Sequence, residues 1–194
     1  LVAESLVMVH IYFADVSESK NMLSDTKSFE RRHVLYCDIL GFSAYTQSEF
    51  FEPSHCFKLF YYLDELLRQS QEEIEPTTPD PLTGQVPDYV ITPEATYCSD
   101  SIIISLPSTN LGAMWLCEAA ARLQNQICFS GFLLRGAIVT GDVYHSGNTI
   151  FGPAIVEAVH LEHDAAVPSI ILSEESYEIF HYAETPDDDE IVQI

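Results

Sequence analysis

The chain has 194 residues, of which 47% are apolar and 20% are charged, enough to bury the core of one globular domain. Its formal net charge is -22, which excludes nucleic acid as an expected partner because a nucleic-acid groove needs an excess of Lys and Arg. Five scattered cysteines without a C-x-x-C pair fit neither a disulfide framework nor a zinc site, and they favour a cytoplasmic location.

Residues 1–30 are predicted to be an N-terminal extension, and residues 31–194 are predicted to form the functional domain. The apolar segment 1–14 contains Glu4 and lacks the basic leader of a signal peptide. No uninterrupted apolar stretch is long enough to span a bilayer, so no membrane association is expected.

The pattern of apolar residues predicts ten strands and helices in chain order. A strand over 33–40 places Val34, Tyr36 and Asp38 on one face. A helix over 54–73 and a proline-marked loop over 76–88 follow. Strands are predicted at 89–92 and 102–106, a helix at 111–128, strands at 132–144 and around 150, a helix at 153–163, a strand at 168–172 and a helix from 173 to about 182. The order β-α-β-β-α-β-β-α-β-α predicts an α+β fold with a mainly antiparallel sheet, a ferredoxin-like βαββαβ core with added strands and helices.

Two aspartates, Asp38 and Asp100, are the most informative residues. Asp38 interrupts an apolar strand, where a bare carboxylate is costly to desolvate unless a partner compensates it. A divalent metal is such a partner, and two acids on neighbouring strands predict a hard-cation site for a nucleoside triphosphate. The alternatives are a helix-capping acid at Asp38 and an ordinary polar turn at Ser99-Asp100-Ser101.

Two further features support a phosphate site. Gly41 follows Asp38 at a predicted strand-to-helix turn, where the backbone amides of Gly41–Ser43 can face an anion. Arg135 is one of eight basic residues and lies within an apolar strand. It is expected either to pair with a carboxylate or to bind phosphate.

Four segments, in this order, resemble the catalytic domain of the class III nucleotidyl cyclases. The segment Tyr36–Ser43 is similar to the first metal motif, F-x-D-I-x-G-F-[ST], and Ser99-Asp100 is similar to the second metal aspartate at a hairpin turn. The segment 135–141 resembles the R-x-G-I-x-x-G strand, and 151–162 resembles F-G-x-x-V-N-x-A-x-R-L-E. The resemblance spans about residues 34–177 and implies a class III cyclase-type fold.

The departures from the family pattern fall in the base-recognising and transition-state parts of the site. Thr96 stands where purine cyclases carry the lysine or glutamate that recognises the base. Thr149 stands at the second position that determines base specificity in this family. Val156 and His160 stand at the family's transition-state asparagine and arginine. A protonated His160 could replace the arginine; a helix histidine beside acidic neighbours is the alternative.

These departures leave two interpretations, a silent partner domain or a cyclase for a different base. The three short motifs around Asp38, Asp100 and Arg135 look like those of the bacterial pyrimidine cyclases of antiphage defence, which make cyclic UMP or cyclic CMP and trigger a separate effector. The aromatic side chains Tyr36, Phe42 and Tyr97 would favour a pyrimidine-sized pocket. We therefore expect a uridylate cyclase, then a cytidylate cyclase, a purine cyclase and a silent nucleotide-binding dimerisation domain; a scaffold without a nucleotide site is the remaining alternative.

The resemblance also implies roles for individual residues. Asp38, Asp100 and the Ile39 carbonyl would bind two Mn²⁺ or Mg²⁺ ions per active site for in-line attack of the 3′-hydroxyl on the α-phosphate. Arg135 and the amides of Gly41, Phe42 and Ser43 would hold the phosphates. The candidates for contact with the base of UTP or CTP are Tyr36, Phe42, Thr96, Cys98 and Thr149. The implied assembly is a homodimer with active sites at the subunit interface.

Overall fold

A computed structural model describes residues 28–70 and 92–184 of the chain. Residues 1–27 of the predicted N-terminal extension and the proline-marked loop over 76–88 lie outside these ranges. Within them, no helix is both long and apolar enough to cross a membrane.

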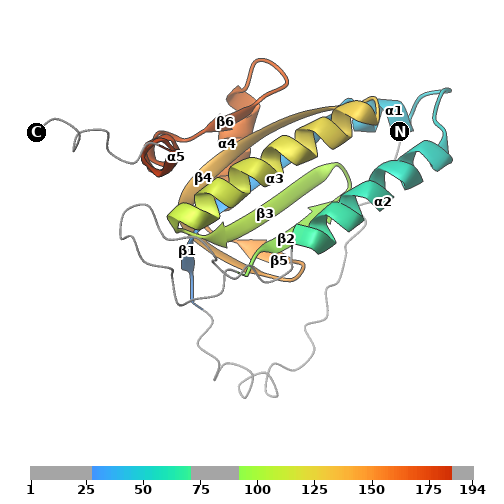
Figure 1. Cartoon of the computed structure of the whole chain (residues 1–194). Helices are drawn as coiled ribbons and strands as arrows, with labels where there is room; N and C mark the ends of the chain where they lie inside the picture. The colour runs from blue at the N-terminus through green and yellow to red at the C-terminus, as the bar shows by residue number, and fades with distance from the viewer. Residues whose placement is uncertain (1–27, 71–91, 185–194) are drawn as a thin grey trace, which may run out of the picture.

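A six-stranded sheet forms the centre of the described domain (Figure 1). Its order is β2 (Glu94–Cys98), β3 (Ser101–Pro107), β1 (Glu30–Leu40), β4 (Leu133–Ser146) and β5 (Thr149–Phe151), and β6 (Ile170–Leu172) also pairs with β4. Every pair is antiparallel except β4 with β6. The predicted ferredoxin-like α+β architecture is confirmed, because β1, β2, β3 and β4 take the order of that core with β5 and β6 added.

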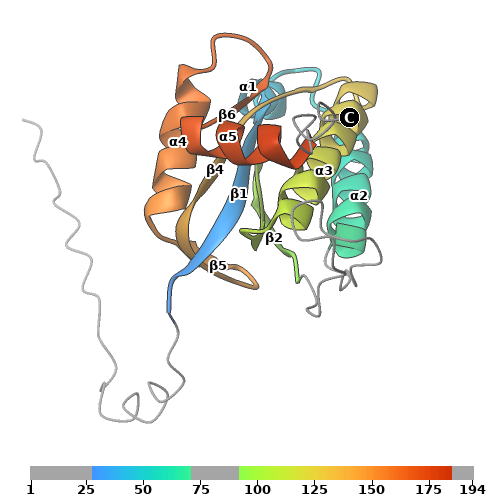
Figure 2. The same cartoon turned by 60° about the vertical axis from the view of Figure 1, so that its left-hand side comes forward.

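Helices cover both faces of the sheet. Figure 2 shows α4 (Pro153–Asp164) on one side, and α2 (Pro53–Ser70) and α3 (Asn110–Phe129) on the other. The last helix, α5 (Glu174–Glu184), follows β6. At the predicted strand-to-helix turn, a short helix, α1 (Phe42–Thr46), follows β1 and ends before α2 begins.

The alternation of side chains along β1 divides the core into two clusters. Leu35, Cys37 and Ile39 are fully buried in the larger cluster, which includes residues of α2 and α3. Val34 packs on the opposite face with residues of α4, and Tyr36 packs partly against the same smaller cluster. The predicted placement of Val34, Tyr36 and Asp38 on one face is thereby confirmed for Val34 and Tyr36.

The strand before Asp100 is β2, which begins at Glu94. Of the strand predicted at 89–92, residues 89–91 lie outside the described ranges, and Thr92 lies outside any strand. Pro93, which directly precedes β2, has no backbone N–H to donate to a ladder. The β2–β3 turn pairs Cys98 with Ser101 around Ser99, a residue with φ of 58°.

We expect Gly136→Ala to destabilise the domain, because β4 lies too close to β1 at this point for a side chain. A Cβ on Gly136 would stand 2.6 Å from the Cys37 sulfur and 2.6 Å from the Tyr36 carbonyl oxygen. Overpacking of this kind costs about 1–3 kcal/mol of unfolding free energy, which urea denaturation measures. Ser146→Ala, at an exposed position of the same strand, is the control. Equal midpoints for the two variants would contradict the close approach.

Candidate active site

Asp38 and Asp100 meet at one end of the sheet. The register places Asp38 opposite Ser101 of β3 and opposite Arg135 of β4. The backbone N–H of Ile39 donates a hydrogen bond of 3.0 Å to the Asp100 carbonyl oxygen. The β2–β3 turn is thereby fixed against the end of β1, and the two aspartates that the sequence singled out become neighbours.

The local charges leave Asp38 undercompensated. Burial raises the pKa of Asp38, and the negative charges of Asp100 and Glu162 raise it further, while Arg135 and His163 oppose them. Burial also raises the pKa of Tyr36, partly offset by its 3.1 Å hydrogen bond with the Ser101 hydroxyl. The net effect at this end of the sheet is an excess of negative charge, which a bound cation would neutralise.

The donors present fit a hard divalent cation. Two carboxylates and a backbone carbonyl at Ile39 are oxygen ligands of the kind that Mg²⁺ and Mn²⁺ prefer. In the part of the chain that the structure describes, no group of three or more His, Cys, Asp and Glu side chains is arranged to hold a metal. A metal at Asp38 and Asp100 would therefore complete its coordination with water and substrate oxygens, as Mg²⁺ commonly does.

Arg135 is paired with a buried carboxylate that sequence reasoning did not identify as part of the site. Its Nε donates to Oε1 of Glu162, whose side chain is 2% exposed, and the imidazole Nδ1 of His163 lies 3.7 Å from the other oxygen. The Arg135 side chain keeps 25% of its surface exposed, so it still faces solvent beside Asp38. In the sequence, the signal that could have identified Glu162 as a site residue is its position in 151–162, the fourth segment that resembles the family.

Gly41 and Phe42 turn the chain away from the aspartates. Gly41 has φ of 77°, a left-handed conformation that glycine adopts without strain, and its carbonyl accepts from the Tyr45 N–H at 2.8 Å. The expected helix start is only the five-residue α1, so any contact with phosphate from Gly41–Ser43 rests on individual amides. The Phe42 ring is 8% exposed and packs edge-on against Phe60 in the larger core cluster, on the face opposite Asp38.

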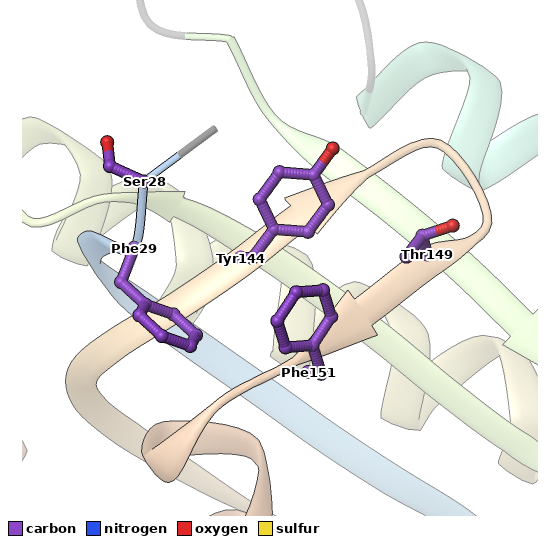
Figure 3. A pocket seen from close by; sticks show the side chains of 5 residues that line it. All are labelled: Ser28, Phe29, Tyr144, Thr149 and Phe151. Atoms are coloured by element: carbon purple, nitrogen blue, oxygen red, sulfur yellow. The ribbon is translucent and has the colours of Figure 1, made fainter. Parts of the chain in front are cut away.

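Three of the candidate base-contacting residues, Thr96, Cys98 and Thr149, lie in different surroundings. The Thr96 hydroxyl lies 3.4 Å from the Asn148 amide oxygen, and Glu94 accepts from the Gly147 N–H at 3.0 Å, so the β4–β5 turn reaches β2. Cys98 is exposed on β2. Thr149 instead lines a pocket of about 480 Å³ with Ser28, Phe29, Tyr144 and Phe151 (Figure 3). The structure thus brings Thr96 to the turn that precedes Thr149, while the Thr149 side chain lies in a separate pocket.

Phe29 of this pocket and Asp38 lie at opposite ends of β1. Phe29 immediately precedes the strand, and Asp38 is close to its end. Nine residues of extended chain separate them, which corresponds to about 30 Å. Val156 and His160, the residues at the family's transition-state positions, are both exposed on α4.

Comparison with known proteins identifies relatives by structure alone, since no family model and no curated protein matches the sequence. The catalytic core of a rhodopsin-guanylyl cyclase with converted specificity, solved with ATPalphaS, matches with a TM-score of 0.54 and 14% identity over 79% of this chain and 82% of that chain. A bacterial light-regulated adenylyl cyclase matches with a TM-score of 0.51 and 12% identity over 84% of this chain and 53% of that chain.

A class III adenylyl cyclase-like ATP-binding protein from Pseudomonas aeruginosa has a TM-score of 0.50 and 13% identity over 78% of this chain and 35% of that chain. The present chain therefore spans about half of the second of these proteins and about a third of the third. The likeness shows the fold: this chain adopts the architecture of class III cyclase catalytic domains.

In metal-free buffer, Asp38→Asn should raise stability at neutral pH. Because the folded-state pKa of Asp38 is raised, the folded state binds its proton more readily, and wild-type stability falls as pH rises from the ordinary aspartate value through the raised one. The asparagine has no charge to desolvate, so the gain should be present at neutral pH and disappear below the ordinary value. Urea unfolding with EDTA at several pH values measures it, with exposed Asp142→Asn as the control. A loss of stability at neutral pH in Asp38→Asn would contradict this electrostatic account.

Arg135→Ala should destabilise the fold by roughly 3 kcal/mol, because it leaves the buried Glu162 carboxylate without its guanidinium. The matched control is Arg122→Ala, which breaks an exposed pair with Glu118 and should cost no more than about 1 kcal/mol. Urea midpoints measure both, and the addition of Glu162→Gln to Arg135→Ala should restore part of the loss. Equal effects of the two alanine variants would show that the Arg135 pair is energetically unimportant.

Proposed function

We propose that this protein is a nucleotidyl cyclase that converts a nucleoside triphosphate into a cyclic nucleotide and pyrophosphate. The observation that supports it most is the meeting of Asp38 and Asp100 beside Arg135, within a fold shared with nucleotidyl cyclases. Their excess negative charge gives a reason for a divalent cation to bind there.

In this proposal the chain holds the reacting groups, with Asp38, Asp100 and the Ile39 carbonyl as ligands for two Mg²⁺ or Mn²⁺ ions. When bound, such ions lower the pKa of the ribose 3′-hydroxyl and neutralise triphosphate charge. The exposed part of the Arg135 guanidinium and the amides of Gly41–Ser43 orient phosphate oxygens. The 3′-oxygen then forms a bond to the α-phosphorus, its proton is lost, and the bond to the leaving pyrophosphate breaks.

A site shared between two chains follows from the resemblance to the class III cyclases. Asp38 lies near one end of β1, whereas the Thr149 side chain lies in a separate pocket with Phe29, which precedes the other end of β1. If Thr149 contacts the base, it acts on the nucleotide bound by the aspartates of a second copy. A homodimer with two equivalent interfacial sites satisfies this requirement.

For the substrate we propose UTP, with CTP as the close variant. Thr96 and Asn148 offer uncharged hydrogen-bonding groups to a base. Tyr36 adds aromatic bulk on the face of Asp38, held by Ser101. Phe42 and Tyr97 do not add to this bulk: Phe42 is in the core, and Tyr97 stacks on Phe60 at 6.0 Å. The size argument for a pyrimidine therefore rests on Tyr36.

The biological setting proposed here follows from the sequence resemblance. In that setting the domain over 31–194 works in the cytoplasm, and its cyclic nucleotide signals phage infection to a separate effector. A second candidate function is a catalytically silent nucleotide-binding domain. It is favoured by the exposed Val156 and His160 at the transition-state positions, and one structural neighbour is named as an adenylyl cyclase-like ATP-binding protein.

The direct test is product formation from UTP, CTP, ATP and GTP separately, with Mn²⁺ and then Mg²⁺, resolved by chromatography. We expect cyclic UMP, and Asp38→Ala or Asp100→Ala should each lower turnover about 10³-fold or more, since loss of metal binding removes several kcal/mol of transition-state stabilisation. Asp142→Ala is the matched control. Wild-type turnover in both site variants would overturn the proposal, and a cyclic purine product would overturn only the choice of base.

Thermal unfolding separates the cyclase from the silent domain. Nucleotide at about 100 times its dissociation constant should stabilise a binding-competent protein by about 2.7 kcal/mol in the presence of Mn²⁺. Stabilisation without product would favour the silent domain. An unchanged melting temperature with all four nucleotides would favour a scaffold without a nucleotide site.

A further inference from the structure

Glu162 occupies a core position that an apolar residue would fill at less cost. It follows Ala154 and Ala158 as the last of the buried residues that recur every four positions along α4, and its side chain is 2% exposed. The two alanines pack α4 against β4 (Figure 2), so closely that a Cβ on Gly141 would stand 3.2 Å from the Ala154 Cβ. Replacement of a buried ion pair by apolar residues is often neutral or stabilising, so packing alone does not explain a carboxylate here.

The ion pair with Glu162 uses only one of the three guanidinium nitrogens of Arg135. Nε donates to Oε1 of Glu162, and among residues 28–70 and 92–184 no other protein group accepts from this guanidinium. The two terminal nitrogens carry four further N–H donors in a fixed planar fork. Arg135 is 25% exposed and pairs with Asp38 in the register of β1 with β4, so these donors remain available beside the candidate metal site.

The Glu162 carboxylate is itself held in place. Its second oxygen, Oε2, lies 3.7 Å from Nδ1 of His163, and almost none of the side chain reaches solvent. The carboxylate therefore has little freedom to turn, and a guanidinium anchored to it at Nε has little freedom to swing. The positions of the terminal nitrogens of Arg135 are thus set before any ligand binds, which lowers the entropic cost of binding one.

We propose that Glu162 is a positioning residue, which holds Arg135 by Nε so that the terminal nitrogens meet phosphate oxygens of the triphosphate bound at Asp38 and Asp100. This inference rests on the proposed function, and it gives Glu162 no contact with the substrate. Loss of the carboxylate leaves the charge of Arg135 in place but releases its orientation. The effect of that loss should therefore be weaker binding of the triphosphate group, and it should vanish when Arg135 itself is absent.

Isothermal titration calorimetry of the full chain with inorganic tripolyphosphate and Mn²⁺ tests this role without any contribution from a base. Glu162→Leu should weaken binding about tenfold, the usual effect of losing one hydrogen bond to a charged group. Glu162→Gln keeps an oxygen that accepts from Nε, so it should bind within about threefold of the wild type. The matched control is Glu118→Leu, which breaks the exposed pair with Arg122 on α3 and should bind as the wild type does.

A double-mutant cycle separates positioning from a general loss of structure. Arg135→Ala should weaken binding at least as much as Glu162→Leu, and the addition of Glu162→Leu to Arg135→Ala should change little. The kcat/KM for the nucleotide that gives cyclic product should follow the same order, with Glu162→Gln close to the wild type. Arg135→Lys replaces Glu162→Leu if the latter does not fold. One ammonium cannot both pair with Glu162 and hold phosphate in the geometry of the fork, so this variant should also weaken binding about tenfold.

The results distinguish this inference from the proposed function. Wild-type tripolyphosphate affinity and kcat/KM in the Glu162→Leu or Arg135→Lys variant would overturn the positioning role, while cyclic product from the wild type would leave the cyclase intact. The same weakening by Glu162→Leu with and without Arg135 would give Glu162 a role in folding alone and would also overturn the inference. Coupled weakening without product from any nucleotide would support the positioning role and overturn the cyclase. Neither binding nor product in the wild type would overturn both.

Discussion

The position of β1 between β3 and β4 is the constraint on which the rest of the structure depends. Its register sets Asp38 between Ser101 and Arg135 and directs Leu35, Cys37 and Ile39 into the larger core. A slip of one residue would exchange the two faces, and would bury the carboxylate among the aliphatic side chains of α2 and α3. Packing of that core therefore fixes the position of Asp38. The same alternation of apolar residues that forms the strand also determines the face on which this carboxylate lies.

The excess of negative charge at this end of the sheet lowers the stability of the fold. Asp38, Asp100 and Glu162 bring three acids near one arginine, and Arg135 is engaged by Glu162. A purely structural arrangement would place a second cation there or remove an acid. An undercompensated carboxylate near the end of a central strand is instead typical of sites that bind a charged ligand, where function and stability are in conflict.

The sequence predicted those parts of the fold that depend on local periodicity. The order of elements, the ferredoxin-like core and the adjacency of Asp38 and Asp100 follow from strand alternation and turn composition. It could not predict the partner of Arg135, because Glu162 reaches it only through the packing of α4 on β4. The placement of Phe42 and Tyr97 also depends on three-dimensional context: Gly41 redirects the chain after β1, and the tight β2–β3 turn sets which face Tyr97 occupies.

The long strand β4 carries the charged Arg135–Glu162 pair at one end and part of the aromatic pocket at the other. Residues 136–138 pair with β6 next to the Arg135–Glu162 pair, whereas residues 144–146 pair with β5 and build the aromatic pocket. Because β1 and β4 are antiparallel along the whole of β1, Phe29 and Asp38 are held about 30 Å apart and cannot approach each other without breaking the sheet. One nucleotide therefore cannot contact Asp38 and the ring of Phe29 within a single chain, whereas the hairpin turn before Thr149 folds back to contact Thr96 of β2.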